Sequence, residues 1–191
     1  MSNIYVTSDL HFCHDRGFVY EPRGFKNVYD MNKAIVDNWN SIVQPDDIVY
    51  VLGDIMLNDN EQGLKLLKSL KGEIHIVLGN HDTATREALY KDCWNVAEVA
   101  LAAKLKYRGY HFFMTHYPCF TGNLEKESLK QCTCNLYGHT HQQTNFYQDM
   151  PFMYHVGVDS HDCTPVHIDQ IIEDMNKKLK SVWKCYNEKG K

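Results

Sequence analysis

Hydrophobic residues in the first half of the chain form short continuous runs that alternate with segments of helical periodicity. The continuous runs lie at residues 4–8, 48–52 and 74–78. Short apolar runs bounded by turn residues are typical of buried strands in a parallel sheet. The periodic segments lie at residues 31–42, 61–70 and 83–92. This alternation predicts a β-α-β-α-β-α unit with parallel strands and crossover helices, and Asp30 is the predicted N-cap of its first helix.

The second half has a different pattern, in which strand-like runs follow one another without long helices. These runs lie at residues 96–107, 110–115, 132–137, 144–147 and 153–158. A closing helix is predicted over residues 168–179, and residues 187–191 are expected to form a frayed tail. The chain contains no internal repeat and no linker. We therefore predict one domain over residues 1–191 that contains two sheets.

Composition narrows the class of protein without identifying its chemistry. The 191 residues are 43% hydrophobic and 23% charged, with a net charge of -4, which is ordinary for a globular domain. The acidic balance gives no reason to expect a long nucleic acid or a membrane as partner. No segment has the pattern of a signal peptide or the length of a membrane span. The seven cysteines form no Cys-x-x-Cys pair, so we expect reduced thiols and a cytoplasmic protein.

The unusual feature is the placement of metal-binding residue types directly after the apolar runs. The chain has 11 histidines, and histidine is the commonest metal ligand. Five blocks carry such residues: Asp9-x-His11, Gly53-Asp54, Gly79-Asn80-His81, His116, and Gly138-His139-Thr140-His141. A single histidine at a strand end is more often structural. Five such blocks in succession are hard to attribute to accident, and ligands gather at the carboxyl ends of strands. Extended backbone would point both side chains of an x-spaced pair the same way. The pattern predicts a metal centre.

In this order, the five blocks resemble the motifs of the calcineurin-like metallophosphoesterases, which are D-x-H, G-D, G-N-H-[DE], a lone His and G-H-x-H. The resemblance extends from residue 4 to about residue 165. It implies an α/β fold, a four-layer α/β/β/α sandwich of two mixed sheets flanked by helices. It also implies two metal ions at one edge of the sheets.

The resemblance also implies roles for individual residues. The first ion would be held by Asp9, His11 and His141. The second would be held by Asn80, His116 and His139, with Asp54 bridging the two. His81 would be the catalytic histidine, which binds no metal, and Asp82 would either orient it or cap the following helix.

The chemistry of these residue types agrees with the implied activity. Two ions about 3.5–4 Å apart can neutralise phosphate oxygens and acidify a water molecule. Nitrogen and oxygen ligands without a thiolate suit two divalent transition-metal ions, with manganese expected first and iron, zinc, cobalt or nickel as alternatives. His81 follows the ligand Asn80 directly, where a histidine can protonate a leaving oxygen.

We therefore expect a phosphoesterase that acts on a small phosphodiester or phosphomonoester. A protein phosphatase is disfavoured, because Val-Asp-Arg-Gly does not follow Gly53-Asp54 and because the third block ends in Asp82 rather than Glu. A nuclease is disfavoured by the acidic balance. A scaffold without turnover remains as an alternative from a different class, although the complete ligand set and His81 argue against it. The sequence gives no indication of oligomeric state.

Residues 14–29 form an irregular segment rich in cations close to the first block. Arg16 and Arg23 are candidate contacts for an anionic substrate, and the segment is a candidate lid or substrate loop. An ordinary solvated loop explains it equally well. His155 and His161 are expected to support the edge of the site structurally.

Overall fold

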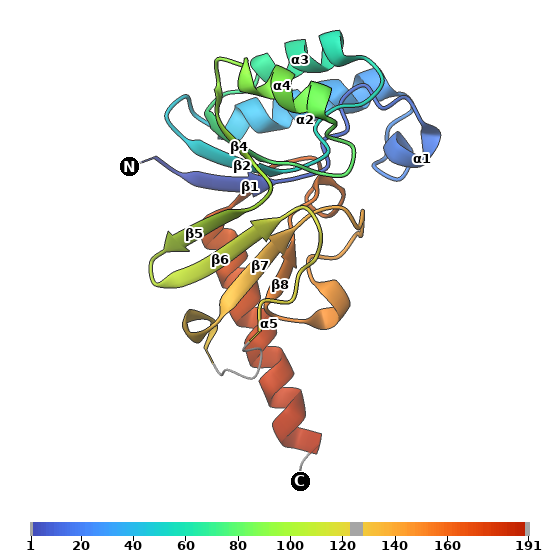
Figure 1. The fold of residues 1–191 in the computed structure, drawn as a ribbon. Coiled ribbons are helices and arrows are strands. Elements are labelled where there is room, and N and C mark those ends of the chain that lie inside the picture. Colours follow the sequence, from blue (N-terminus) through green and yellow to red (C-terminus); the bar gives the residue numbers. More distant parts are fainter. Residues whose placement is uncertain (1, 123–127, 190–191) are drawn as a thin grey trace.

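The computed structural model of the chain describes residues 2–122 and 128–189, with side chains described as far as residue 182. Its strands form two sheets that lie one above the other in Figure 1. The five-stranded sheet has the order β4-β3-β2-β1-β9, and the four-stranded sheet has the order β5-β6-β7-β8. The structure therefore has the predicted architecture of two mixed sheets flanked by helices.

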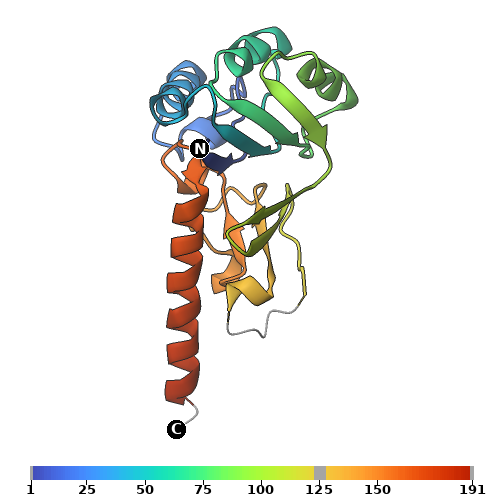
Figure 2. The same cartoon turned by 90° about the vertical axis from the view of Figure 1, so that its left-hand side faces the viewer.

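The five-stranded sheet is built from the alternating pattern of the first half. Its parallel strands are β1 (Ile4–Thr7), β2 (Ile48–Leu52), β3 (Glu73–Val77) and β4 (Val96–Ala100), and β9 (Val166–His167) pairs antiparallel with β1. Three crossover helices cover one face of the sheet, as Figures 1 and 2 show. They are α2 (Val28–Ile42), α3 (Asn60–Lys68) and α4 (Ala84–Lys91). The predicted parallel arrangement is confirmed.

Apolar packing beneath these helices explains where α2 begins. Val28 and Met31 are both buried in the helix-facing core, so the helix starts one turn earlier than the sequence predicts. Asn27 is the N-cap, and its side chain accepts a hydrogen bond from the backbone N–H of Asp30. The Asp30 carboxylate in turn accepts a bond from the Asn27 amide. The prediction of Asp30 as the N-cap is therefore wrong, although Asp30 takes part in the cap.

The four-stranded sheet comes from the second half of the chain. Its strands are β5 (Ala103–Tyr107), β6 (Tyr110–Thr115), β7 (Thr133–Tyr137) and β8 (Met153–His155). One side of this sheet packs on α5 (Ile168–Lys189), which runs beside it in Figure 2. Tyr154 donates a hydrogen bond to Asp174 of α5. The same apolar cluster includes Val6 and Leu52 of the other sheet, so a shared core joins the two sheets.

Three predicted elements differ from the structure. Residues 96–107 form two strands, β4 and β5, that belong to different sheets. Residues 144–147 form no strand: Phe146 makes an isolated bridge to Tyr154, and a short 3-10 helix follows, η2 (Tyr147–Asp149). Helix α5 continues to Lys189, so residues 187–189 are helical rather than frayed. Residues 190–191 lie outside the described part.

The remaining elements are short. Helix α1 (Gly17–Tyr20) lies within the irregular segment of residues 14–29. The other two are the 3-10 helices η1 (Leu129–Gln131) and η3 (Val158–Ser160). Within the described residues, no helix combines the length and apolarity that a membrane crossing requires.

Candidate metal centre

Strand register brings the five sequence blocks together at one edge of the molecule. Thr7 of β1 pairs with Val51 of β2, and Leu52 pairs with Val77 of β3, so these strands end side by side. In the other sheet Thr115 pairs with Tyr137, so β6 and β7 also end side by side. Because parallel strands share one carboxyl edge, the residues that follow them converge.

Hydrogen bonds between the loops that follow these strands hold the five blocks next to one another. The backbone N–H groups of Asp9 and His11 donate to the carbonyls of Gly53 and Asp54 at 3.0 and 2.9 Å. The two sheets are joined where the N–H of His139 donates to Asp9 Oδ2 at 2.9 Å. The first and last sequence blocks are therefore held in direct contact.

Five of the expected ligands occupy the left-handed backbone region. Their φ angles are 58° for Asp9, 51° for His11, 54° for Asp54, 67° for His139 and 47° for His141. The expectation of extended backbone at the x-spaced pairs is therefore wrong, although the paired side chains do converge. Such a conformation costs about 1–2 kcal/mol for a residue with a side chain. Strain of this kind is typical of functional sites.

Glycines at two of these turns leave room for the ligands. A Cβ atom on Gly53 would lie 2.6 Å from His116 Nδ1, and Gly53 itself has φ +89°. A Cβ atom on Gly138 would lie 2.5 Å from Asp9 Oδ2. Any larger residue at either position would displace a ligand side chain.

The first expected ligand set consists of Asp9, His11 and His141. His11 Nε2 lies 3.2 Å from His141 Nε2, and both nitrogens lie 3.9 Å from Asp9 Oδ1. Asp9 is fully buried, and its Oδ1 has no hydrogen-bond partner within the described part of the chain. A buried carboxylate oxygen without a donor is costly unless a cation binds it.

The second expected set consists of Asn80, His116 and His139. Asn80 Oδ1 lies 2.8 Å from His116 Nε2 and 2.9 Å from His139 Nδ1. The Nδ1–H of His116 can donate to the Leu52 carbonyl at 2.8 Å, which leaves the lone pair of Nε2 directed at the centre.

Asp54 lies between the two sets. Its Oδ2 is 3.7 Å from His11 Nε2 and 3.5 Å from His116 Nε2. Its Oδ1 accepts a hydrogen bond from the backbone N–H of His81 at 2.9 Å. One carboxylate oxygen therefore faces a nitrogen ligand of each set.

Asp82 has a different role from either of those predicted. The N-cap of α4 is Thr83. Asp82 Oδ2 accepts hydrogen bonds from the backbone N–H groups of Asp54 and Gly79, both at 2.8 Å. Tyr90 donates to Asp82 Oδ1 at 2.7 Å. Asp82 thus ties the turn after β2 to the turn after β3 and fixes the backbone of Asp54.

Asp159 is a supporting residue that the sequence reasoning missed. Its Oδ2 accepts a hydrogen bond from His141 Nδ1 at 2.9 Å, which directs His141 Nε2 toward Asp9. Arg23 holds Asp159 through its Nε at 2.9 Å and its Nη2 at 3.2 Å. The only sequence signal was the position of Asp159 just before His161, close to the expected edge of the site.

The two candidate substrate arginines are placed very differently. The Arg23 side chain is only 1% exposed. Besides Asp159, it donates to the carbonyls of Asp9 and Leu10, so its position favours support of the ligands over substrate contact. Arg16 is exposed and follows His14 by two residues, so it stays a candidate contact for an anionic substrate.

His14 and His81 lie at the rim of the first set. The His14 ring stacks on His11 with a centroid distance of 5.2 Å, and it lies 6.2 Å from the His81 ring. His81 Nε2 lies 4.0 Å from Asp54 Oδ2, and the His81 side chain is 43% exposed. His81 therefore reaches the centre from the solvent side.

The histidines of the first and second sets differ in the direction in which their pKa values are shifted. Burial is the main cause that lowers the pKa values of His11 and His139, with neighbouring positive groups adding to it. Burial opposes the protonation of His141, but the hydrogen bond that its Nδ1–H donates to Asp159 and the charge of Asp9 outweigh burial and raise the pKa of His141. Neutral imidazoles are the metal-binding form.

The donor geometry also fits metal ions. Two nitrogen or oxygen ligands that share an ion at about 2.1 Å lie roughly 3 Å apart. The histidine pair of the first set and the Asn80–histidine pairs of the second match this value at 2.8–3.2 Å, whereas Asp9 Oδ1 lies 3.9 Å from its two histidines. Atoms from Asp9, His11 and His141, and likewise from Asp9, Asp54 and His116, lie within 4.8 Å of one another. The expected ligands therefore form a candidate metal centre at the place that the sequence predicts.

A family profile described as the calcineurin-like phosphoesterase superfamily domain matches residues 2–169. The chain belongs to this family. It is 33% identical over 187 residues to an uncharacterised protein of Methanocaldococcus jannaschii, and the match covers 93% of each chain. It is also 28% identical over 204 residues to the Gene 66 protein of Mycobacterium phage D29, covering 94% of this chain and all of that protein.

Among solved structures, a protein of unknown function from Aquifex aeolicus superposes with a TM-score of 0.69 at 23% sequence identity. The superposition covers 91% of this chain and 99% of the Aquifex chain. At this level of identity the likeness concerns the fold, and it extends through both sheets.

Proposed function

We propose that the protein is a dimetal phosphoesterase that hydrolyses small phosphate esters, with phosphodiesters preferred. The observation that carries this proposal is the position of Asp54 Oδ2, within 3.7 Å of His11 Nε2 and 3.5 Å of His116 Nε2. A carboxylate between two nitrogen-bearing sets is placed as a ligand shared by two neighbouring ions would be.

Each set has the donors for one ion. Asp9, His11 and His141 would hold the first, Asn80, His116 and His139 the second, and Asp54 would contact both. The nitrogen and oxygen donors suit manganese and also iron, zinc, cobalt or nickel. When bound, two such ions neutralise phosphoryl oxygens and provide a nucleophilic water at neutral pH.

His81 is the residue proposed to move a proton. Its backbone N–H is held by Asp54 Oδ1, and its ring lies 5.7 Å from the His11 ring at the solvent side of the centre. The two ligand sets are complete without it. A protonated imidazole at this place can donate its proton to the leaving oxygen as the P–O bond breaks.

Buried and backbone groups do the positioning. Asp82 fixes the backbone N–H of Asp54 at 2.8 Å, and Asp159 fixes the Nδ1–H of His141 at 2.9 Å. Preorganised ligands need little rearrangement when charge develops in the transition state. The alternative of a scaffold without turnover gives no reason for an exposed histidine beside a complete ligand set.

Activity assays of the manganese-loaded protein test the proposal. A panel of bis(p-nitrophenyl) phosphate, p-nitrophenyl phosphate, an alkyl phosphodiester and a phosphoserine peptide separates diesterase, monoesterase and protein phosphatase activity. Treatment with a chelator should abolish turnover, and added manganese should restore it. Absence of turnover on the whole panel by protein with two metal equivalents would favour the scaffold.

The His81→Ala variant tests the proton donor. We expect it to keep its fold and both metals and to lose about 10²–10⁴ in kcat on the alkyl diester. The loss should be smaller for nitrophenyl esters, because nitrophenolate leaves without a proton. Equal rates of variant and wild type on the alkyl diester would remove His81 from this role.

A further inference from the structure

Exposed aromatic side chains flank the metal centre. The large hydrophobic side chains that the described residues expose are Phe18, Tyr29, Trp94, Leu101, Tyr117, Phe120 and Val182. Two of them make ring contacts with histidines at the metal centre: Phe18 with His14 at the rim, and Tyr117 with His116 and His139. They are 74% and 51% exposed, so neither contributes its full surface to the core.

Phe18 lies on the side of the first ligand set. Its ring meets His14 edge-on at a centroid distance of 5.7 Å, and His14 in turn stacks on His11. Helix α1 carries Phe18, and the neighbouring Val19 is buried in the core. This anchor holds the Phe18 ring in place while it remains open to solvent.

Tyr117 lies on the side of the second ligand set. Its ring meets His139 at 4.6 Å and His116 at 5.2 Å, both edge-on. The Thr115 hydroxyl donates to the Tyr117 carbonyl at 2.8 Å and fixes the backbone there. The second ligand set therefore has an exposed aromatic ring in direct contact with it, and the first set has one that is separated from His11 by the His14 ring.

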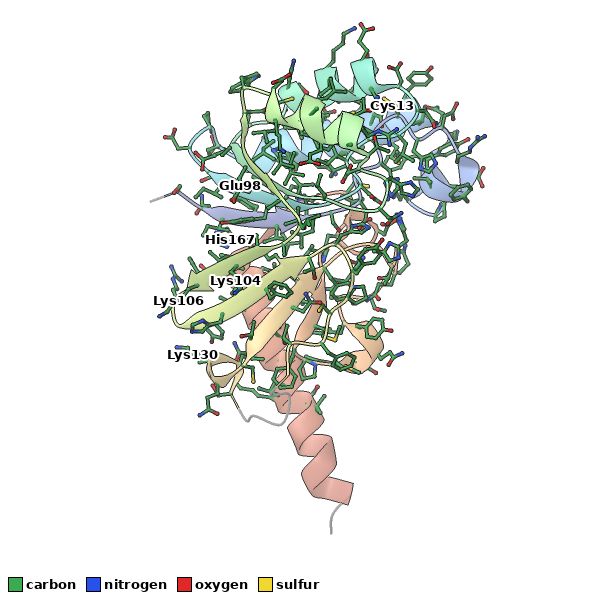
Figure 3. The ribbon with its side chains drawn as sticks, in the orientation of Figure 1. Cys13, Glu98, Lys104, Lys106, Lys130 and His167 are labelled. Atoms are coloured by element: carbon green, nitrogen blue, oxygen red, sulfur yellow. The ribbon has the colours of Figure 1, made fainter. Side chains whose placement is uncertain are left out.

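Lysines are placed elsewhere on the second sheet. Lys104, Lys106 and Lys130 lie on the side of β5–β7 away from the metal edge in Figure 3. Lys106 pairs with His111 near the start of β6, whereas His116 follows the end of that strand. A long polyanion would need cations along its path beside the centre. These three lysines lie away from such a path, which favours a short substrate over a long polyanion.

We propose that Phe18 and Tyr117 are the two stacking walls of the active site. The substrate class is then a phosphodiester with an aromatic base on each side of the scissile phosphate, which is the chemistry of a dinucleoside monophosphate. Water would add to phosphorus as one P–O bond breaks, and the leaving oxygen would take a proton. The products are a nucleoside monophosphate and a nucleoside. This specificity rests on the hydrolytic function proposed above.

Two matched substrates test the inference. A dinucleoside monophosphate carries two bases, and glycerophosphoglycerol has an alkyl diester without rings. Stacking on an aromatic side chain is worth about 5- to 100-fold for each base on alanine substitution. We expect Phe18→Ala and Tyr117→Ala each to lower kcat/KM by about that factor for the dinucleoside, and by a much smaller factor for the glycerol diester.

Two variants serve as controls. Tyr117→Phe keeps the ring and should retain the dinucleoside activity. Trp94→Ala removes a side chain that is 76% exposed and precedes β4 at the opposite edge of the sheet from the metal centre, so it should change neither substrate. Metal content measured on every variant separates stacking from loss of an ion.

The outcomes distinguish the two proposals. If neither diester is hydrolysed but a nitrophenyl ester is, this inference fails and the hydrolase stands; if the nitrophenyl esters are not hydrolysed either, the proposed function fails together with it. If both are hydrolysed with equal kcat/KM and the alanine variants change nothing, the stacking walls are overturned and the hydrolase stands. An equal loss on both substrates together with lost metal would make Tyr117 a structural residue and also overturn the inference. A much higher kcat/KM for long single-stranded nucleic acids than for the dinucleoside would overturn the proposal of a short substrate.

Discussion

The two ligand sets differ in what holds them. In the first set, Asp9 and His11 are buried, and His141 is fixed by the Asp159 carboxylate, which Arg23 fixes in turn. In the second set, Asn80 is exposed and His139 is half-buried. There His116 is oriented by a backbone carbonyl, that of Leu52. Each set has an exposed member, His141 or Asn80, and His116 of the second set is buried. The sets differ in their outer support, because a buried carboxylate lies behind His141 and a backbone carbonyl lies behind His116.

This difference predicts unequal affinity for the two ions. The first set contains its own carboxylate, that of Asp9, whereas Asn80 contributes a neutral amide oxygen to the second. Charged ligands and fixed outer partners both strengthen metal binding. We expect the first ion to be retained and the second to exchange more readily.

The largest effect should come from Asp54→Ala, which removes the oxygen that faces both sets. We expect this variant to lose both ions, because each set is left with fewer donors and less negative charge. The ions stabilise charge in the transition state by several kcal/mol, so their loss should lower kcat by about a thousandfold. Elemental analysis of the purified variant measures the metals, and circular dichroism checks that the sheets still form.

Single-set variants provide the matched controls. His141→Ala should weaken chiefly the binding of the first ion, and His139→Ala chiefly the binding of the second. Each variant should retain the other ion. Two full equivalents of metal in Asp54→Ala would contradict the bridging position. Equal losses in the two histidine variants would erase the difference between the sets.

The next effect concerns the support behind the first set. Arg23→Met keeps an unbranched side chain but leaves the Asp159 carboxylate buried without its guanidinium. Removal of an outer partner typically costs 10–100-fold in metal affinity, and we expect that loss for the first ion alone. Calorimetric titration of the metal-free protein measures both affinities. Asp159→Asn should lower the affinity for the same ion. A lower affinity for the second ion instead would show that Arg23 and Asp159 do not support the first set.

The positions of the strands, and the convergence of the candidate ligands, could be predicted from sequence because both depend on local patterns. Apolar runs located β1, β2 and β3, and the polar residues after them converge on one edge. Contacts distant in sequence could not be predicted. Arg23 and Asp159 are 136 residues apart, so no local pattern links them. The cluster of cations in residues 14–29 also does not show that the Arg23 side chain points inward. The break between β4 and β5 depends on which sheet each strand joins, and hydrophobicity alone does not specify it.

The third prediction concerns pH and the loop that carries Asp159. His155 is buried and accepts or donates a hydrogen bond at 2.8 Å with Ser160, the residue after Asp159. Burial lowers the pKa of His155 to about 3. Above a pH of about 6.5 this histidine is neutral in both the folded and the unfolded protein, so it costs the fold nothing. As the pH falls from about 6.5 toward 3, the unfolded protein binds a proton that the folded protein does not, and the free energy of unfolding decreases. Over 1.5 pH units below 6.5 the loss is about 2 kcal/mol.

Urea denaturation of the metal-free protein at pH 7.5 and pH 5 tests this contribution. The wild type should lose about 2 kcal/mol more of its unfolding free energy than His155→Gln does. His111→Gln, at an exposed position of β6, is the matched control and should behave as wild type. Parallel losses in wild type and His155→Gln would show that this histidine does not link stability to pH.

The smallest effect should come from Arg16, the exposed cation on the side of the first set. Its charge lies near His14 at the rim, and the Arg23 guanidinium is already committed to Asp159 beneath. An exposed cation gains only about 0.2–1 kcal/mol from an anionic partner, because water screens the charge. Arg16→Gln should therefore raise KM by about two- to fivefold, with kcat and both metal equivalents unchanged. Steady-state kinetics on an alkyl diester at low salt measure the change, and added salt should reduce the difference from wild type. Lys26→Gln, exposed on the same segment, is the control for net charge. If Arg16→Gln and Lys26→Gln raise KM equally, the effect comes from the net charge of the protein. Arg16 would then make no specific contact with the substrate on the side of the first set.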